Sequence, residues 1–272
     1  MATIGIFDSG YGGLTIFNKI QDTLPQYDYI YLGDNARAPY GTRSFEVVYR
    51  FTRQAVMRLF EEGCRLVILA CNTASAKALR NIQQKDLPLL DPSLRVLGVI
   101  RPTVEAIDRI SRTKHIGILG TTGTISSQSY TIEINHLFPH ITVTGEACPM
   151  WVPLVENNEF TSPGADYFVK KHIEHILSLD PAIDTLILGC THYPLLSDKI
   201  KAVLPPGITL FAQGERVAES LADYLLRHPE INERLTQKAS RRFLTTESVD
   251  KFAETASVFL HQSVDVEHVS IH

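Results

Sequence analysis

The sequence is poor in the features that mark several large classes of protein. It holds only four cysteines in 272 residues and no CxxC pair, which excludes a dense disulfide framework and favours free thiols in a reducing compartment. No apolar run approaches the ~20 residues that a membrane-spanning helix requires. The first ten residues lack the basic and apolar regions of a signal peptide. We therefore expect a cytoplasmic protein with no membrane partner.

An excess of positive charge is also missing. With 26 Lys and Arg against 30 Asp and Glu, the formal net charge is −4, which argues against a nucleic-acid partner held by electrostatics. The basic residues are scattered apart from the pair Arg241-Arg242, which we interpret as a solvated surface feature. The chain is long enough for one large or two modest globular domains.

What the sequence does contain is an alternation of apolar runs and amphipathic segments. Several runs are continuous Ile, Val and Leu, which is typical of strands covered on both faces of a parallel sheet. The predicted strands are Thr3–Asp8, Tyr29–Leu32, Leu66–Ala70, Arg95–Val99, His115–Leu119, Ile141–Gly145, Thr185–Gly189, Ile208–Phe211 and a final piece near Val264–Val269. The predicted helices are Ser44–Glu62, Ser126–Leu137, Pro163–Leu179 and Glu215–Leu226. This alternation predicts an α/β fold with doubly wound parallel sheets.

A weak internal repeat indicates two related halves. The stretch IGIFDSGYGG begins at Ile4 and IGILGTTGTI begins at Ile116, and a cysteine motif follows each stretch, at Cys71 and Cys190. We therefore expect two pseudo-symmetric domains with the active site in the cleft between them. The expected domains are residues 1–97 together with 208–272, and residues 98–207.

Polar motifs follow several predicted strands, at the carboxyl ends where parallel sheets bind ligands. They are Asp8-Ser9-Gly10 with Gly12-Gly13, Gly33-Asp34 with Pro39-Tyr40-Gly41, Cys71-Asn72-Thr73, Thr121-Thr122-Gly123-Thr124 and Cys190-Thr191-His192. The first motif is a glycine-rich turn whose N–H groups favour an anion. It lacks the GxGxxG spacing and the lysine of nucleotide loops, so it favours a small carboxylate.

Two of the four cysteines stand at the lip of a buried strand. We interpret Cys64 and Cys148 as small buried residues, which is the usual role of a cysteine. Cys71 and Cys190 instead precede polar residues that would open a helix, and a helix N-terminus lowers the pKa of a thiol. Both thiols are therefore expected to gain or lose a proton near neutral pH.

Three kinds of chemistry could use this pair of thiols. A zinc site of Cys71, Cys190 and His192 is disfavoured because it lacks a close pair of ligands beyond the Cys-x-His step. A cysteine hydrolase could use Cys190 with His192 but would leave Cys71 without a role. Two-base proton transfer uses both thiols, because inverting a stereocentre requires one group on each face of the carbon.

The motifs together resemble the glutamate racemase family, within the aspartate/glutamate racemase superfamily, and the resemblance covers nearly the whole chain. It implies interconversion of L- and D-glutamate, which supplies D-glutamate for peptidoglycan, without pyridoxal phosphate, metal or other cofactor. It further implies that Cys71 takes the proton from D-glutamate and Cys190 from L-glutamate, assisted by Asp8 and His192. The family's additional glutamate matches Glu156, with Glu159 as a close alternative. A homodimer is expected by the same resemblance.

The resemblance also implies a set of substrate contacts. They are Asp8, Ser9, Tyr40, Gly41, Asn72, Thr73, Thr121, Thr124, Thr191 and His192. Asp8 could instead cap a helix, and His192 could simply bond a backbone carbonyl. The chain departs from the family at Ala212-Gln213-Gly214-Glu215, where an Asp-Ser-Gly-Glu step is common, and at Arg101, an unexpected charge that could pair with a nearby acid or lie at a subunit contact.

Two alternatives remain open from the sequence. A related racemase could act on aspartate, another small acid or a hydantoin, because such enzymes share the two-cysteine cleft. A non-enzymatic, two-lobed module could bind an amino acid without turnover. The second alternative gives no role to paired thiols, so Cys71 together with Cys190 discriminates against it.

Overall fold

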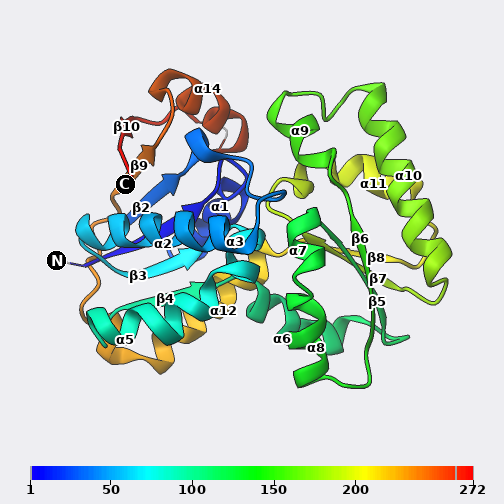
Figure 1. The fold of residues 1–272 in the computed structure, drawn as a ribbon, viewed down its shortest axis with the longest axis horizontal. Helices are drawn as coiled ribbons and strands as arrows, with labels where there is room; N and C mark the ends of the chain where they lie inside the picture. Colours follow the sequence, from blue (N-terminus) through cyan, green and yellow to red (C-terminus); the bar gives the residue numbers. More distant parts are fainter. Residues whose placement is uncertain (1, 261, 272) are drawn as a thin grey trace.

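The chain forms two lobes, each built around a parallel β-sheet, in a computed structural model that describes residues 2–260 and 262–271. The first lobe contains the N-terminal and C-terminal segments, and the second contains the middle of the chain (Figure 1). Among the described residues, no helix has both the length and the apolar character needed to cross a membrane.

The first lobe holds a six-stranded sheet and the second a four-stranded sheet, and every strand pair is parallel. In spatial order, the first sheet is β10 (Val266–His268), β9 (Arg241–Thr245), β2 (Tyr29–Gly33), β1 (Thr3–Asp8), β3 (Cys64–Leu69) and β4 (Arg95–Gly98). The second sheet is β6 (Thr142–Ala147), β5 (His115–Gly120), β7 (Thr185–Gly189) and β8 (Thr209–Phe211).

Helices connect these strands. In the first lobe they are α1 (Leu14–Thr23), η1 (Asn35–Arg37), α2 (Phe45–Glu61), α3 (Asn72–Lys77), α4 (Leu79–Asn81), η2 (Ile82–Asp86), α5 (Leu87–Leu90), α12 (Gly214–Arg227), α13 (Pro229–Asn232) and α14 (Val249–Leu260). The remaining helices are α6 (Ile100–Ile110), α7 (Thr122–Ser126), α8 (Ser129–Leu137), α9 (Trp151–Glu156), α10 (Pro163–Leu179), η3 (Tyr193–Leu196) and α11 (Ser197–Val203).

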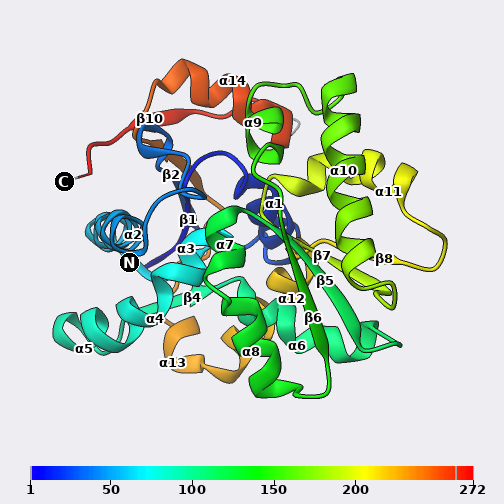
Figure 2. The ribbon, with the colours of Figure 1, turned by 45° about the vertical axis from the view of Figure 1, so that its right-hand side comes forward.

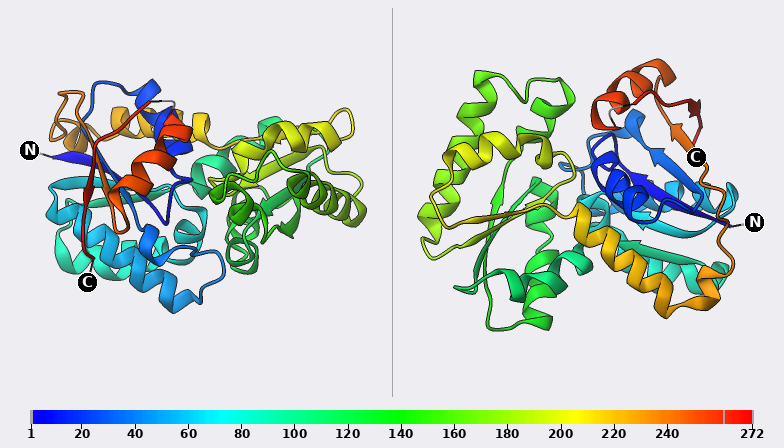
Figure 3. Two further views of the ribbon diagram at one scale, coloured as in Figure 1. Left: turned by 90° about the horizontal axis from the view of Figure 1, so that it is seen from above. Right: turned by 180° about the vertical axis from the view of Figure 1, so that it is seen from behind.

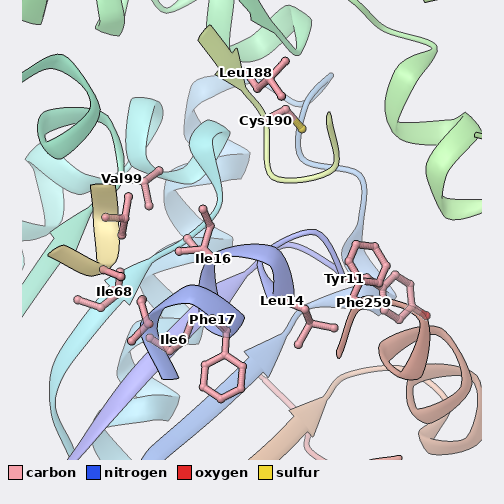
Figure 4. Packing of buried hydrophobic residues seen from close by; sticks show 14 of the residues in the cluster. Ile6, Tyr11, Leu14, Ile16, Phe17, Ile68, Val99, Leu188, Cys190 and Phe259 are labelled. Carbon is pink, nitrogen blue, oxygen red and sulfur yellow. The ribbon is translucent and has the colours of Figure 1, made fainter. Parts of the chain in front are cut away.

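Both faces of each sheet are covered by helices, as the continuous apolar runs predict. In β1, Ile4 and Ile6 pack with α1, whereas Phe7 joins the cluster on the α2 side, because successive strand residues point to opposite faces. In the second lobe, α10 lies over one face, and α6 and α8 over the other (Figure 2). Residues of both lobes, including Ile6, Ile16, Ile68 and Cys190, belong to one buried cluster (Figure 4).

The two sheets repeat one strand order, which confirms the expected pair of pseudo-symmetric α/β units. The order β2-β1-β3-β4 in the first sheet corresponds to β6-β5-β7-β8 in the second. Cys71 follows β3 and Cys190 follows β7, so the two cysteines occupy equivalent strand ends. The repeat seen in the sequence therefore has a structural counterpart at the thiols.

The boundary near residue 208 needs correction. Strand β8 pairs with β7, so the second sheet extends to Phe211 rather than ending before the expected boundary. The first expected domain also includes residues 1, 261 and 272, which lie outside the described residues. The predicted helix Ser126–Leu137 is two helices, α7 and α8, because Gln128 adopts a left-handed conformation with φ of 57°.

Arg241 and Arg242 have partly exposed side chains, as expected of a surface pair, but they also begin strand β9 inside the first sheet, which the sequence pattern does not predict. The guanidinium of Arg241 lies 4.7 Å from the ring centroid of Tyr29. Arg242 forms ion pairs with Glu62 and Glu267. The long stems of the two arginines cover the sheet while their charges find partners.

Arg101 pairs with acids, as one of its two readings expected. Its guanidinium nitrogens lie 2.8 Å from a carboxylate oxygen of Glu105 and 2.6 Å from a carboxylate oxygen of Glu133. The contact with Glu133 links α6 to α8, that with Glu105 lies within α6, and together they account for the unexpected charge.

Candidate active site

The loops after β1, β3, β5 and β7 meet where the two lobes face each other, with α3 of the first lobe opposite α7 of the second (Figure 1). The N–H of Gly123 donates to the carbonyl of Gly41 at 2.7 Å across this boundary. Because carboxyl ends of parallel strands gather polar loops at one edge of a sheet, two such edges here enclose one shared site.

Cys71 is the N-cap of α3 and is only 6% exposed. Its sulfur accepts a hydrogen bond from the N–H of Ala74 at 3.5 Å and lies 3.4 Å from the hydroxyl oxygen of Ser9. Burial and the nearby negative charge of Asp8 raise its pKa to about 12, despite these hydrogen bonds. The predicted lowering of this pKa is therefore wrong, because desolvation outweighs the N-terminus of a short helix.

Cys190 stands at the matching position in the second lobe, also 6% exposed. Its sulfur lies 3.8 Å from Nδ1 of His192. The Asp8-Ser9 turn contacts both cysteine loops, since Ser9 lies 3.4 Å from the sulfur of Cys71 and Asp8 accepts from the Thr191 hydroxyl at 3.4 Å. The structure thus brings the two predicted thiols to one site.

His192 bridges Cys190 and an acid. Its Nε2 atom lies 3.1 Å from Oε1 of Glu156, at the end of α9. Burial opposes protonation of the ring, but the hydrogen bonds to Cys190 and Glu156 outweigh it and raise the pKa of His192 to about 10. This shift favours the imidazolium form at neutral pH, in which both ring nitrogens donate. Glu159 is exposed, so the geometry selects Glu156 of the two predicted glutamates.

Asp8 is completely buried between the two cysteine loops. Its carboxylate accepts hydrogen bonds from the N–H of Gly10 at 2.9 Å and from the Thr191 hydroxyl at 3.4 Å. Burial raises the pKa of Asp8, although His192 and backbone hydrogen bonds oppose the shift. Helix α1 has Gly13 as its N-cap, so Asp8 is not the cap that an alternative reading allowed.

The glycine-rich turn lets the two lobes approach closely. A Cβ atom at Gly12 would lie 2.4 Å from Nδ1 of His192 and 2.4 Å from the hydroxyl oxygen of Thr191, which is far inside contact distance. A Cβ atom at Gly41 would lie 2.9 Å from Cβ of Thr121. The closed arrangement of the lobes therefore requires glycine, which has no side chain, at positions 12 and 41.

Three threonine hydroxyls form a further polar group beside Cys71. Thr73 lies 3.0 Å from Thr121 and 3.3 Å from Thr124, and the latter two lie 3.1 Å apart, each distance joining Oγ1 atoms. All three are buried, and they come from both lobes. The predicted contact residue Tyr40 is also buried, but its hydroxyl donates to Asp34.

Asn72 is held by residues that sequence reasoning missed as site residues. Its carboxamide oxygen accepts from the Tyr130 hydroxyl at 2.6 Å, and its nitrogen donates to Gln213 at 2.8 Å. Gln213 stands in the stretch where the chain departs from the racemase pattern, which is the one sequence signal that could have drawn attention to it. Nothing in the sequence around Tyr130 indicates this contact.

The site as described is closed. Of the ten predicted contact residues, only Ser9 and Gly41 are not buried. Two surface cavities lie elsewhere along the boundary between the lobes, and neither is lined by Cys71 or Cys190. No group of three or more His, Cys, Asp or Glu side chains among residues 2–260 and 262–271 is arranged to hold a metal ion.

Comparisons with known proteins agree with this geometry. A family model described as Asp/Glu/Hydantoin racemase matches residues 9–221. A glutamate racemase of Shouchella clausii is 40% identical over 263 residues, covering 96% of this chain and 91% of the relative. The structure of glutamate racemase isoform RacE1 from Bacillus anthracis has a TM-score of 0.90 at 36% identity, covering 99% of this chain and 97% of that one.

A second solved structure, of glutamate racemase from Francisella tularensis in complex with D-glutamate, has a TM-score of 0.87 at 31% identity and covers 99% of this chain and 97% of that one. Sequence and fold thus match over almost the full length. The chain, with one cysteine loop in each lobe, belongs to the Asp/Glu/hydantoin racemase family.

Proposed function

We propose that this racemase interconverts L- and D-glutamate by two-base proton transfer, with Cys71 and Cys190 as the bases. The observation that carries the proposal is the placement of one thiol from each lobe at equivalent strand ends within one closed site. Two acid/base groups on opposite faces of a carbon can invert it, which a single group does poorly.

The reaction balances without an external reagent. One cysteine, as thiolate, takes the Cα proton, and the electron pair of the broken C–H bond remains on the substrate. The other cysteine, as thiol, delivers its proton to the opposite face of Cα. Cys190 acts as base toward L-glutamate and Cys71 toward D-glutamate.

His192 and Asp8 set the charge around the two sulfurs. An imidazolium at His192, held by Glu156, places positive charge 3.8 Å from the sulfur of Cys190 and stabilises negative charge there. Burial, and after it the negative charge of Asp8, make a thiolate at Cys71 costly and raise the pKa of that thiol. A substrate ammonium group near Asp8 would offset that negative charge and so favour the thiolate once substrate is bound.

Hydroxyl and amide groups of both lobes supply donors for the two substrate carboxylates. Asp8 instead accepts from the substrate ammonium group. The proposed contacts are Asp8, Ser9, Tyr40, Gly41, Asn72, Thr73, Thr121, Thr124, Thr191 and His192. Since the Tyr40 hydroxyl is engaged by Asp34, the Tyr40-Gly41 segment contributes through its backbone. Donors fixed in a dry site stabilise the charge that develops when the Cα proton leaves.

Glutamate is favoured over aspartate or a hydantoin as the substrate. The relatives that match nearly the full chain are named glutamate racemases, and one solved relative holds D-glutamate. We further propose that the chain needs no cofactor, acts in the cytoplasm as a homodimer, supplies D-glutamate for peptidoglycan, and comprises two domains that close on the substrate.

Loss of optical rotation tests this function directly. Wild-type protein should racemise L-glutamate, measured by circular dichroism, while Cys71→Ser and Cys190→Ser should each lower kcat by at least about a hundredfold. Cys64→Ser is the matched control and should retain turnover, because the Cys64 sulfur is buried at the start of β3, beside the Thr3 hydroxyl and at the strand end opposite Cys71. Binding of glutamate without any change in rotation by the wild type would instead support a binding module.

A further inference from the structure

Four buried side chains form a hydrogen-bonded cluster next to Cys71, which we call the Gln213 cluster: Asn72, Thr103, Tyr130 and Gln213. The amide nitrogen of Gln213 donates to Thr103 Oγ1 at 2.8 Å and to the Tyr130 hydroxyl, and its oxygen accepts from Asn72 at 2.8 Å. Tyr130 in turn donates to the carboxamide oxygen of Asn72 at 2.6 Å. Each of the four residues is at most 3% exposed.

The cluster lies where the chain crosses between the lobes. Thr103 is in the first turns of α6, just after the crossing from β4, and Gln213 caps α12, just after the return crossing from β8. Figure 3 shows the golden helix α12 leading from this boundary into the first lobe. Asn72 belongs to the first lobe and Tyr130 to helix α8 of the second, so the cluster joins both crossings and both lobes.

Gln213 has the chemistry that this position demands. A glutamine side chain offers one acceptor oxygen and a nitrogen with two hydrogens, and here all three functions have partners. Because the nitrogen of Gln213 is engaged by Thr103 and Tyr130, its oxygen faces Asn72 and requires the nitrogen end of the Asn72 carboxamide there. Tyr130 fixes the oxygen end of the same carboxamide.

We propose that Gln213 is a positioning residue that couples closure of the lobes to presentation of Asn72 to the substrate. The nitrogen of Asn72 has two hydrogens, and Gln213 accepts one of them. The second is left for a substrate carboxylate beside Cys71. The proposal rests on the proposed function, and it assigns a role to the stretch where this chain departs from its family's pattern.

The cluster explains how an open cleft would lose affinity. When the second lobe moves away, Tyr130 moves with it and the oxygen of Asn72 loses its donor. Asn72 then keeps only its hydrogen bond to Gln213, which has itself lost Tyr130 and Thr103 as partners, so the pair is less ordered and substrate must bear the entropy of ordering it again. Closure on the substrate therefore orders one of its binding groups.

The test compares Gln213→Met with Ser111→Ala. Methionine keeps the length and burial of Gln213 but removes its hydrogen bonds. Ser111 is equally buried at the end of α6, and its hydroxyl donates to Asp184 at 2.7 Å. Replacing Ser111 should therefore lower the stability of the fold without touching the site. Affinity for L-glutamate is measured by calorimetry in a Cys71→Ser/Cys190→Ser background, where turnover cannot interfere, and KM and kcat are measured in the active protein.

We expect Gln213→Met to weaken glutamate binding and raise KM about tenfold, the scale of a hydrogen bond to a charged group. Ser111→Ala should lower the melting temperature and leave both quantities within about twofold. Tyr130→Phe, which removes one hydroxyl, should shift KM in the same direction as Gln213→Met and serves if the methionine variant does not fold.

The proposal would be overturned if Gln213→Met lowered the melting temperature as much as Ser111→Ala but left the affinity for glutamate and KM unchanged. The cluster would then have a structural role only. The same result for Tyr130→Phe would also overturn it. Wild-type protein that binds glutamate without racemising it would instead remove the proposed function, and the affinity comparison would still decide the role of Gln213.

Discussion

Glu156 holds His192 from the side opposite Cys190, with 3.1 Å between the carboxylate oxygen and Nε2 of the ring. The contact joins helix α9 to the loop that carries the second thiol. It is one reason why the pKa of His192 rises to about 10 although burial opposes protonation. The hydrogen bonds to Cys190 and Glu156 therefore favour a protonated ring of His192 beside Cys190 at neutral pH.

Replacing Glu156 should expose this dependence. In Glu156→Gln the ring keeps a hydrogen-bond partner but loses the negative charge, so the pKa of His192 should fall. We expect kcat/KM to drop by about a hundredfold, with the alkaline limb of the pH profile moved to lower pH. The profile of kcat/KM against pH measures this, and Glu159→Gln, at an exposed position, is the control. An unshifted alkaline limb would show that Glu156 does not act through His192.

Stability should also depend on His192. The unfolded ring titrates near pH 6.5, and the folded ring near 10, so between these values the folded state binds more protons. The contribution of His192 to stability is fully present below about pH 6.5 and is lost as the pH rises toward 10. Denaturant unfolding at several pH values should show this decline in the wild type and a smaller one in His192→Gln. Identical slopes for the two proteins would contradict the raised pKa.

The closed arrangement depends on Gly12. In Gly12→Ala the new Cβ atom would overlap His192 and Thr191, so the lobes must stay farther apart. We expect kcat/KM to fall by about a hundredfold, because small misplacements of reacting groups are costly. Steady-state kinetics measure the loss, and Gly164→Ala is the control, since its nearest contact would be an ordinary 3.4 Å. Full activity in Gly12→Ala would mean that the closed form is not the reactive one.

Much of the fold and the candidate site is predictable from local sequence. Buried parallel strands such as Thr3–Asp8 and Thr185–Gly189 have a pattern that needs no tertiary information, and both have the predicted bounds. The convergence of the cysteine loops follows from strand ends in a two-lobed sheet fold. Strand β9 is not predicted, because two charged arginines interrupt the apolar pattern by which a buried strand is recognised. The side chains that pair with these arginines lie far away in the chain.

Properties that depend on closure are not predictable in this way. The direction of the Cys71 pKa shift reverses because burial among side chains from remote segments outweighs the local helix end. The Gln213 cluster joins four segments that are remote in sequence, so no motif encodes it. The resemblance to a family suggests which residues act, whereas the contacts show how they are held.

The most direct test of the central claim is the initial fate of the Cα hydrogen in heavy water. Each thiol carries a single hydrogen that exchanges with solvent, and the donating thiol stands on the face opposite the base. We predict that D-glutamate formed first from L-glutamate carries solvent deuterium at Cα, while unreacted L-glutamate keeps its protium, as mass spectrometry of the separated enantiomers would show. Early D-glutamate that retains the original protium would show that one group serves both faces, and would contradict the assignment of Cys71 and Cys190 as a pair of bases.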